Sequence, residues 1–156
     1  MKNKLLVFLL LGISLLLLNS CTKIEATKDS AYFINLAYQI SKGDIKNGAI
    51  IDLRPLQNSE DSNDYDHGHI HGSLSYDFNN QEESHFINWI TGLKNKKCTI
   101  LIIDSGHHEY QTICKYLKKA KYQKVICFEL GYQKLKEDNT FSKKIEESTG
   151  TEDCGC

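Results

Sequence analysis

Three short apolar runs, separated by segments with helical spacing, constrain the fold of this chain more than any other feature. The runs cover residues 49–53, 99–103 and 124–128, and each places four apolar residues among five. Runs of this length are typical of strands that are buried on both faces. Because they alternate with helical segments, they predict an α/β fold in which helices flank a parallel sheet. Residues 99–103, the most apolar run, are the expected central strand.

Four segments are expected to form the flanking helices, because apolar side chains recur in most of them at spacings of three or four residues. These segments are residues 32–40, 86–93, 110–120 and 135–145. The almost wholly polar stretch 57–67 is expected to be a surface loop. With 156 residues, the chain is long enough for one domain of ordinary size.

The first 20 residues have the features of a signal peptide. An apolar run of 14 residues, Leu5 to Leu18, follows two lysines, and it is shorter than the roughly 20 residues that span a membrane. The sequence Leu18-Asn19-Ser20-Cys21 resembles the lipobox of bacterial lipoproteins, which implies cleavage before Cys21 and its acylation. A plain secretory signal and an uncleaved anchor are the alternatives. We expect a membrane-anchored lipoprotein of the cell envelope, attached to the lipid bilayer through Cys21, with residues 21–30 as a tether.

The charge balance argues against a nucleic-acid partner. The whole chain has 19 basic and 20 acidic residues. Removing residues 1–20 takes away two lysines and no acidic residue, which leaves a net charge of −3. An electrostatic nucleic-acid binder would carry a strong excess of basic residues.

Two motifs resemble the rhodanese-like domain family. They are Ile51-Asp52-Leu53-Arg54, at the end of a predicted strand, and Gly68-His69-Ile70-His71-Gly72-Ser73. The order of the later strand, loop and helix agrees with the family over about residues 30–136. The resemblance implies a single rhodanese-like domain over residues 31–145, with Asp52, Arg54, Gly68, His69 and Gly72 as its motif residues. His71 stands where the family usually has proline.

The resemblance breaks at the catalytic position. In rhodaneses, a cysteine opens the loop after the central strand and carries sulfur as a persulfide that loop N–H groups cradle. Here Asp104 occupies that position, and the active-site-like loop contains no cysteine: Asp104, Ser105, Gly106, His107, His108 and Glu109. A carboxylate cannot form a persulfide and repels anionic thiosulfate. We therefore expect a degenerate sulfurtransferase without cofactor, acting as a binding or regulatory module for an unknown protein or small molecule.

Several interpretations of the polar residues remain open. Asp104 could be a general base, a metal ligand or, the interpretation we favour, a capping residue in an inert loop. The loop histidines with Glu109 could form an acid/base or metal constellation, although we expect no resident metal. His67, His69 and His71 alternate and would share one face of an extended segment; the alternative is that His69 belongs to the family's turn and its neighbours are surface residues.

The cysteines divide into two groups. Cys98, Cys114 and Cys127 lie in or beside apolar segments and are expected to be small buried thiols, although a disulfide between any pair suits an exported protein. Cys154 and Cys156 end a polar tail, residues 146–156, that we expect to be flexible and inert. Two alternative functions use them: a sulfurtransferase or thiol-redox enzyme whose tail cysteines carry sulfur or redox equivalents, and a metal-handling protein.

Overall fold

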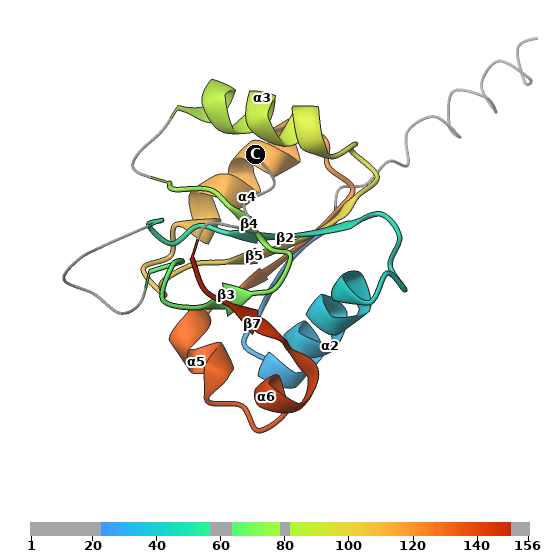
Figure 1. Cartoon of the computed structure of the whole chain (residues 1–156). Coiled ribbons are helices and arrows are strands. Elements are labelled where there is room, and N and C mark those ends of the chain that lie inside the picture. Colours follow the sequence, from blue (N-terminus) through green and yellow to red (C-terminus); the bar gives the residue numbers. More distant parts are fainter. Residues whose placement is uncertain (1–22, 57–63, 79–81, 151–156) are drawn as a thin grey trace, which may run out of the picture.

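Five parallel strands form the centre of the domain. A computed structural model describes residues 23–56, 64–78 and 82–150. The sheet has the strand order β1-β6-β5-β2-β4. Its strands are β1 (Lys23–Thr27), β2 (Gly48–Asp52), β4 (Leu74–Ser75), β5 (Thr99–Ile103) and β6 (Lys124–Phe128). The predicted α/β class is confirmed, and β5 is the middle strand as expected (Figure 1).

Helices cover both faces of this sheet. They are α2 (Ser30–Ser41), α3 (Glu83–Leu93), α4 (Tyr110–Lys119), α5 (Tyr132–Lys136) and α6 (Phe141–Lys144). Figure 1 shows the sheet edge-on, with α3 and α4 on one face and α2, α5 and α6 on the other. In β5, Ile100 and Ile102 pack in the first layer, whereas Leu101 and Ile103 pack in the second. Burial on both faces explains why the strands are continuous apolar runs rather than alternating ones.

The segment predicted as one helix over residues 135–145 is two short helices, so that prediction is wrong. Helix α5 begins three residues earlier, at Tyr132, and ends at Lys136, and α6 begins at Phe141. Between them, Asp138 Oδ1 accepts hydrogen bonds from the backbone N–H and the hydroxyl of Thr140, at 2.8 and 2.7 Å. Such a side-chain turn competes with the helical backbone pattern.

Two segments predicted to lie outside the fold contribute strands to it. The expected tether, residues 21–30, contains the edge strand β1, which pairs along its whole length with β6. The expected flexible tail, residues 146–156, begins with β7 (Glu147–Ser148), which pairs antiparallel with β3 (His69–Ile70). Both strands are polar and partly exposed, so they lack the apolar pattern that revealed the central strands.

Several predictions fall outside the described residues and stay predictions. They concern the signal peptide (residues 1–20), the acylation of Cys21, most of the polar loop 57–67 and the tail thiols of Cys154 and Cys156. Within the ranges that the structure describes, no helix has the length and apolar character needed to cross a membrane.

Candidate functional site

The loop of residues 104–109 joins the carboxyl end of β5 to the start of α4. Asp104 is fully buried there. Its Oδ1 accepts the backbone N–H of Gly106 at 2.8 Å, and its Oδ2 accepts the backbone N–H of Tyr110, the first residue of α4, at 3.2 Å. The predicted capping role is thus present, although Asp104 stands five residues before Glu109, the position that precedes the helix.

The Asp104 carboxylate takes the place that a bound anion would have at this helix start. Backbone N–H groups at the beginning of a helix form a ready-made anion site. One such donor, on Tyr110, and a loop donor on Gly106 point at the protein's own carboxylate. An external anion would have to compete with a covalently attached one for these two donors.

Glu109 places a second carboxyl group near Asp104. The Oε2 atom of Glu109 is buried and has no hydrogen-bond partner among the described residues. Burial raises the pKa of Asp104 to about 6; the two backbone donors oppose this rise, and the neighbouring Glu109 carboxyl adds to it. Burial and the neighbouring carboxyl group therefore both favour the protonated form of Asp104.

The loop histidines point outward rather than toward Asp104. The side chain of His107 is 80% exposed; its Nδ1 lies 3.1 Å from Ser105 Oγ and 3.9 Å from Glu109 Oε1. His108 has a φ of +70°, and its ring meets that of Tyr110 edge-on. Across residues 23–56, 64–78 and 82–150, no three His, Cys, Asp or Glu side chains gather closely enough to hold a metal ion.

Gly131, the residue before α5, packs closely against the backbone of the loop. Gly131 has a φ of +79°, and a Cβ atom built there would lie 2.6 Å from the backbone nitrogen of Gly106. The backbone N–H of Tyr132 also donates to the carbonyl of Asp104, at 2.9 Å. Only glycine combines this conformation with such a close backbone approach. The loop therefore has little space in which to rearrange.

The Arg54 side chain is buried, and its guanidinium bonds to groups of the protein itself, so its role is structural. Its guanidinium binds the Asp52 carboxylate through Nε at 3.0 Å and Nη2 at 2.7 Å. It also donates to the carbonyls of Asp64 and Gly68, at 3.1 and 2.7 Å. Charge pairing and hydrogen bonds compensate the desolvation of this 1% exposed side chain. The family motif residues Asp52, Arg54 and Gly68 thus join the end of β2 to the following turn.

A second network, which sequence reasoning missed, connects Arg54 to the C-terminal strand. The Arg54 guanidinium lies 3.7 Å from the centre of the Tyr132 ring, and the Tyr132 hydroxyl donates to Glu147 at 2.6 Å. Lys136 forms an ion pair with the same Glu147 oxygen at 2.9 Å. Burial and the hydrogen bond to Glu147 raise the pKa of Tyr132. Burial alone would raise the pKa of Glu147 as well, but its bonds to Tyr132 and Lys136 outweigh this effect and lower it. No apolar periodicity marks Glu147 in the sequence.

The three alternating histidines have separate partners. His67 binds Asp64 at 2.6 Å, His69 is buried and stacked on the Tyr65 ring, and His71 binds Ser148 Oγ at 2.7 Å. They form no common face for a metal. His69 lies in the short strand β3, and its neighbours His67 and His71 are exposed surface residues, as the alternative interpretation held for these neighbours.

The interior cysteines include one disulfide. Cys114 of α4 is bonded to Cys127 of β6, so the prediction of free thiols is wrong for this pair and the disulfide alternative holds. Cys98 is a free buried thiol, as predicted. Burial raises the pKa of Cys98, and Lys94 only partly opposes this rise. A thiolate nucleophile is therefore disfavoured at Cys98.

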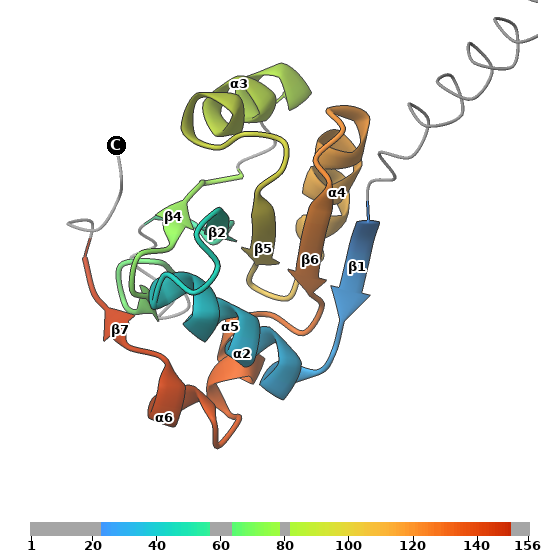
Figure 2. The ribbon, with the colours of Figure 1, turned by 90° about the vertical axis from the view of Figure 1, so that its right-hand side faces the viewer.

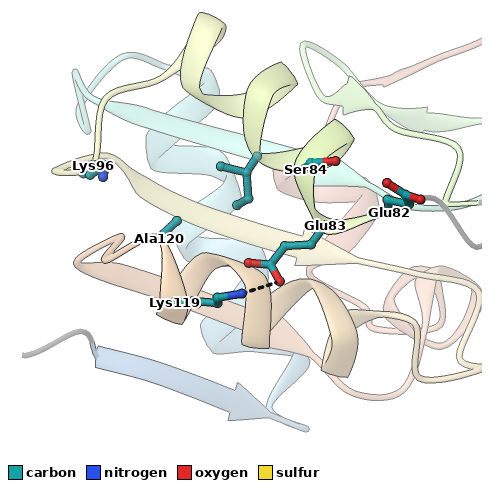
Figure 3. A pocket seen from close by; sticks show the side chains of 7 residues that line it. Glu82, Glu83, Ser84, Lys96, Lys119 and Ala120 are labelled. Carbon is teal, nitrogen blue, oxygen red and sulfur yellow. Dashed lines mark hydrogen bonds and ion pairs between the residues drawn. The ribbon is translucent and has the colours of Figure 1, made fainter.

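A hollow of about 640 Å³ opens elsewhere, between α3 and α4 (Figure 3). It is lined by Glu82, Glu83, Ser84, Ile87, Lys96, Lys119 and Ala120. An ion pair between Lys119 and Glu83, at 2.9 Å, crosses it. None of these residues belongs to the loop 104–109, so the hollow is distinct from the candidate site.

Comparisons with known proteins agree with this architecture. The rhodanese-like domain family model matches residues 36–138. The crystal structure of the Alr3790 protein from Anabaena sp. is similar, with a TM-score of 0.52 at 15% identity over 74% of this chain and 80% of that one. The solution NMR structure of the rhodanese-like domain of the same protein gives a TM-score of 0.51 at 15% identity, over 82% and 78%. No curated protein sequence matches the chain.

Proposed function

Because the chain belongs to the rhodanese-like domain family, we propose that it is a member without sulfurtransferase activity that acts as a binding or regulatory module. One observation carries this proposal. The Asp104 carboxylate, which we place at the position of the family's nucleophile, accepts the backbone N–H of Gly106 in the loop and that of Tyr110 at the start of α4. The loop therefore lacks a sulfur acceptor, and two of the backbone donors that could bind an anionic sulfur donor are occupied by its own carboxylate.

The loop still offers a defined surface for a partner. His107 and His108 are exposed, and Leu130, 39% exposed, follows on the segment that packs against Gly106. Gly131 holds the backbone of this surface in place. A preformed surface loses little conformational freedom on binding. We propose that the partner, a protein or small molecule, contacts these side chains rather than the interior of the loop.

We further propose that the protein is an exported lipoprotein attached through Cys21. The leader and the lipobox-like sequence support this, and so does the Cys114–Cys127 disulfide, because disulfides persist in oxidising compartments. We expect Cys21→Ser to move the protein from the membrane fraction to the soluble fraction. Unchanged membrane association would contradict lipidation at this residue.

A thiosulfate:cyanide sulfurtransferase assay on residues 22–156 tests the loss of activity. We expect no thiocyanate above the uncatalysed rate. Turnover that disappears in the Cys154→Ser, Cys156→Ser double variant would support the alternative in which the tail carries sulfur. Turnover that survives in the double variant would overturn the proposal altogether.

A further inference from the structure

We infer that the edge of the domain where the strands begin is a docking surface for anionic phospholipid headgroups. Lysines gather on the segments that meet there, and we call this set the basic edge: Lys23, Lys94, Lys96, Lys97, Lys118, Lys119, Lys121 and Lys124. The inference rests on the proposed attachment through Cys21 and adds to it the orientation of the domain on the membrane.

Backbone and side-chain hydrogen bonds join the segments of the basic edge. The N–H of Lys23 donates to the carbonyl of Gln123 at 2.8 Å, and the N–H of Gln123 donates to the carbonyl of Lys96 at 2.9 Å. The Tyr122 hydroxyl donates to the carbonyl of Lys94 at 3.1 Å. Figure 2 shows β1, β5 and β6 beginning at this end, where α4 also ends. The lysines, distant in sequence, therefore share one edge.

Most of the positive charge on this edge is not neutralised by ion pairs. Lys23 pairs with Glu25 at 3.2 Å and Lys119 with Glu83 at 2.9 Å. The other six lysines form no ion pair within the described part of the chain. Glu82 lines the adjoining hollow as a further opposing charge. Because the chain after residue 20 has a net charge of −3, the positive charge is concentrated on one side of an acidic molecule.

The position of the proposed lipid anchor favours a membrane surface as the partner of the basic edge. Lys23, the first residue of β1, stands two residues after Cys21. Two residues span at most about 7 Å, which is comparable to the screening length of about 8 Å at physiological salt. A lipid attached at Cys21 would therefore hold the basic edge within electrostatic reach of the headgroups. One lipid signal beside a basic patch is a known combination for stable attachment.

This orientation has a consequence for the candidate site. The loop 104–109 follows the carboxyl end of β5, whereas the basic edge lies at the opposite end of the strands. A five-residue strand is about 16 Å long. With the basic edge on the membrane, the loop with His107 and His108 faces away from the bilayer, toward a partner in the surrounding compartment.

The test measures vesicle binding by the unacylated chain, residues 22–156, which retains every described residue. Phosphatidylcholine vesicles are compared with vesicles that also contain phosphatidylglycerol, by co-sedimentation at low and physiological salt. We expect binding to the anionic vesicles only, weakened by salt. The variant Lys96→Gln, Lys97→Gln, Lys121→Gln should bind roughly 100-fold more weakly, since each lysine contributes about a fivefold change near an anionic surface.

A matched control removes the same charge from another part of the surface. The variant Lys134→Gln, Lys143→Gln, Lys144→Gln changes exposed lysines of α5 and α6 and should bind like the unmodified chain. Equal loss in both variants, equal binding to neutral vesicles, or tighter binding to duplex DNA than to anionic vesicles would each overturn the inference. Failure here is distinguishable from failure of the proposed function, because the sulfurtransferase assay does not depend on this surface, and a high-salt wash in the Cys21→Ser fractionation removes protein that is held by the basic edge alone.

Discussion

The buried carboxylate of Asp104 accepts the backbone N–H of Tyr110 across six residues, at 3.2 Å. With the bond from Gly106, this contact closes the loop that follows the central strand. The arrangement needs no ligand to satisfy the donors at the start of α4. The Asp104 carboxylate therefore occupies the N–H groups of Gly106 and Tyr110 without a bound ligand.

If Asp104 stands at the nucleophile position as proposed, Asp104→Cys should introduce sulfur-accepting chemistry. The thiol would stand beside the N–H groups of Gly106 and Tyr110, which favour its thiolate form. In a background with Cys154→Ser and Cys156→Ser, we expect the thiolate at position 104 to attack the outer sulfur of thiosulfate, which forms a persulfide and releases sulfite. Mass spectrometry of the intact protein and its peptides should detect the added sulfur atom. Asp104→Ser is the control of similar size and should gain no sulfur. If the peptide that contains residue 104 gains no sulfur at saturating thiosulfate, the proposed arrangement of N–H donors around position 104 is contradicted.

Asp104→Asn should remove most of the pH dependence of stability between pH 4 and 6. The pKa of Asp104 is raised from 3.8 to about 6, so the folded state binds more protons than the unfolded state between these values. The resulting stability is fully present below pH 3.8 and is lost as pH rises through about 6, a change of at most about 3 kcal/mol. Asparagine removes this titration. Urea unfolding should therefore show a shallower fall in stability between pH 4 and 6 in the variant.

The control for this measurement is Asp29→Asn. Asp29 caps α2 by accepting the N–H of Tyr32 at 2.9 Å, in an exposed position. This substitution should leave the fall in stability between pH 4 and 6 as it is in the unmodified chain. An identical pH profile for Asp104→Asn and the unmodified chain would show that Asp104 titrates as an ordinary carboxyl group.

Arg54→Ala should destabilise the domain strongly. It would leave the Asp52 carboxylate, which is fully buried, without its partner, and such losses cost about 3–5 kcal/mol. Lys134→Ala is a suitable comparison because Lys134 forms an exposed pair with Glu137, and exposed pairs contribute about 0–1 kcal/mol. Chemical denaturation of both variants measures the difference. Similar denaturation midpoints for the two variants would contradict the structural role of Arg54.

Gly131→Ala should destabilise the protein by more than the strain of its own backbone conformation, because the new Cβ would also collide with the loop. Gly131 and Gly43 share a φ of +79°, but a Cβ at Gly131 would meet Gly106 at 2.6 Å, whereas at Gly43 nothing lies within 4 Å. Gly43→Ala should therefore cost only the backbone strain, about 1–2 kcal/mol. Gly131→Ala should cost more in urea unfolding and accelerate amide exchange at Gly106. Equal costs would contradict the close packing of the loop.

Apolar patterning predicted the parts of the fold that are buried on both sides. Strands β5 and β6 have the bounds that their apolar runs predicted, because every residue after the first in each strand is buried. Strand β1 was missed because no residue of Lys23–Thr27 is fully buried and its pairing depends on β6. The break between α5 and α6 has a local signal in Asp138, but helical propensity concealed it.

For the candidate site too, some features could be predicted from the sequence and others depend on the tertiary structure. The sequence by itself determined that residue 104 is a carboxylate and that residues 104–109 contain no thiol, since covalent chemistry depends only on residue identity. It also determined the family motifs and the presence of six cysteines. Only the tertiary structure decided that Asp104 satisfies Gly106 and Tyr110, that Cys114 pairs with Cys127, and that Glu147 joins Tyr132. These relations depend on distances between elements that strand order and packing set, and no local pattern encodes them.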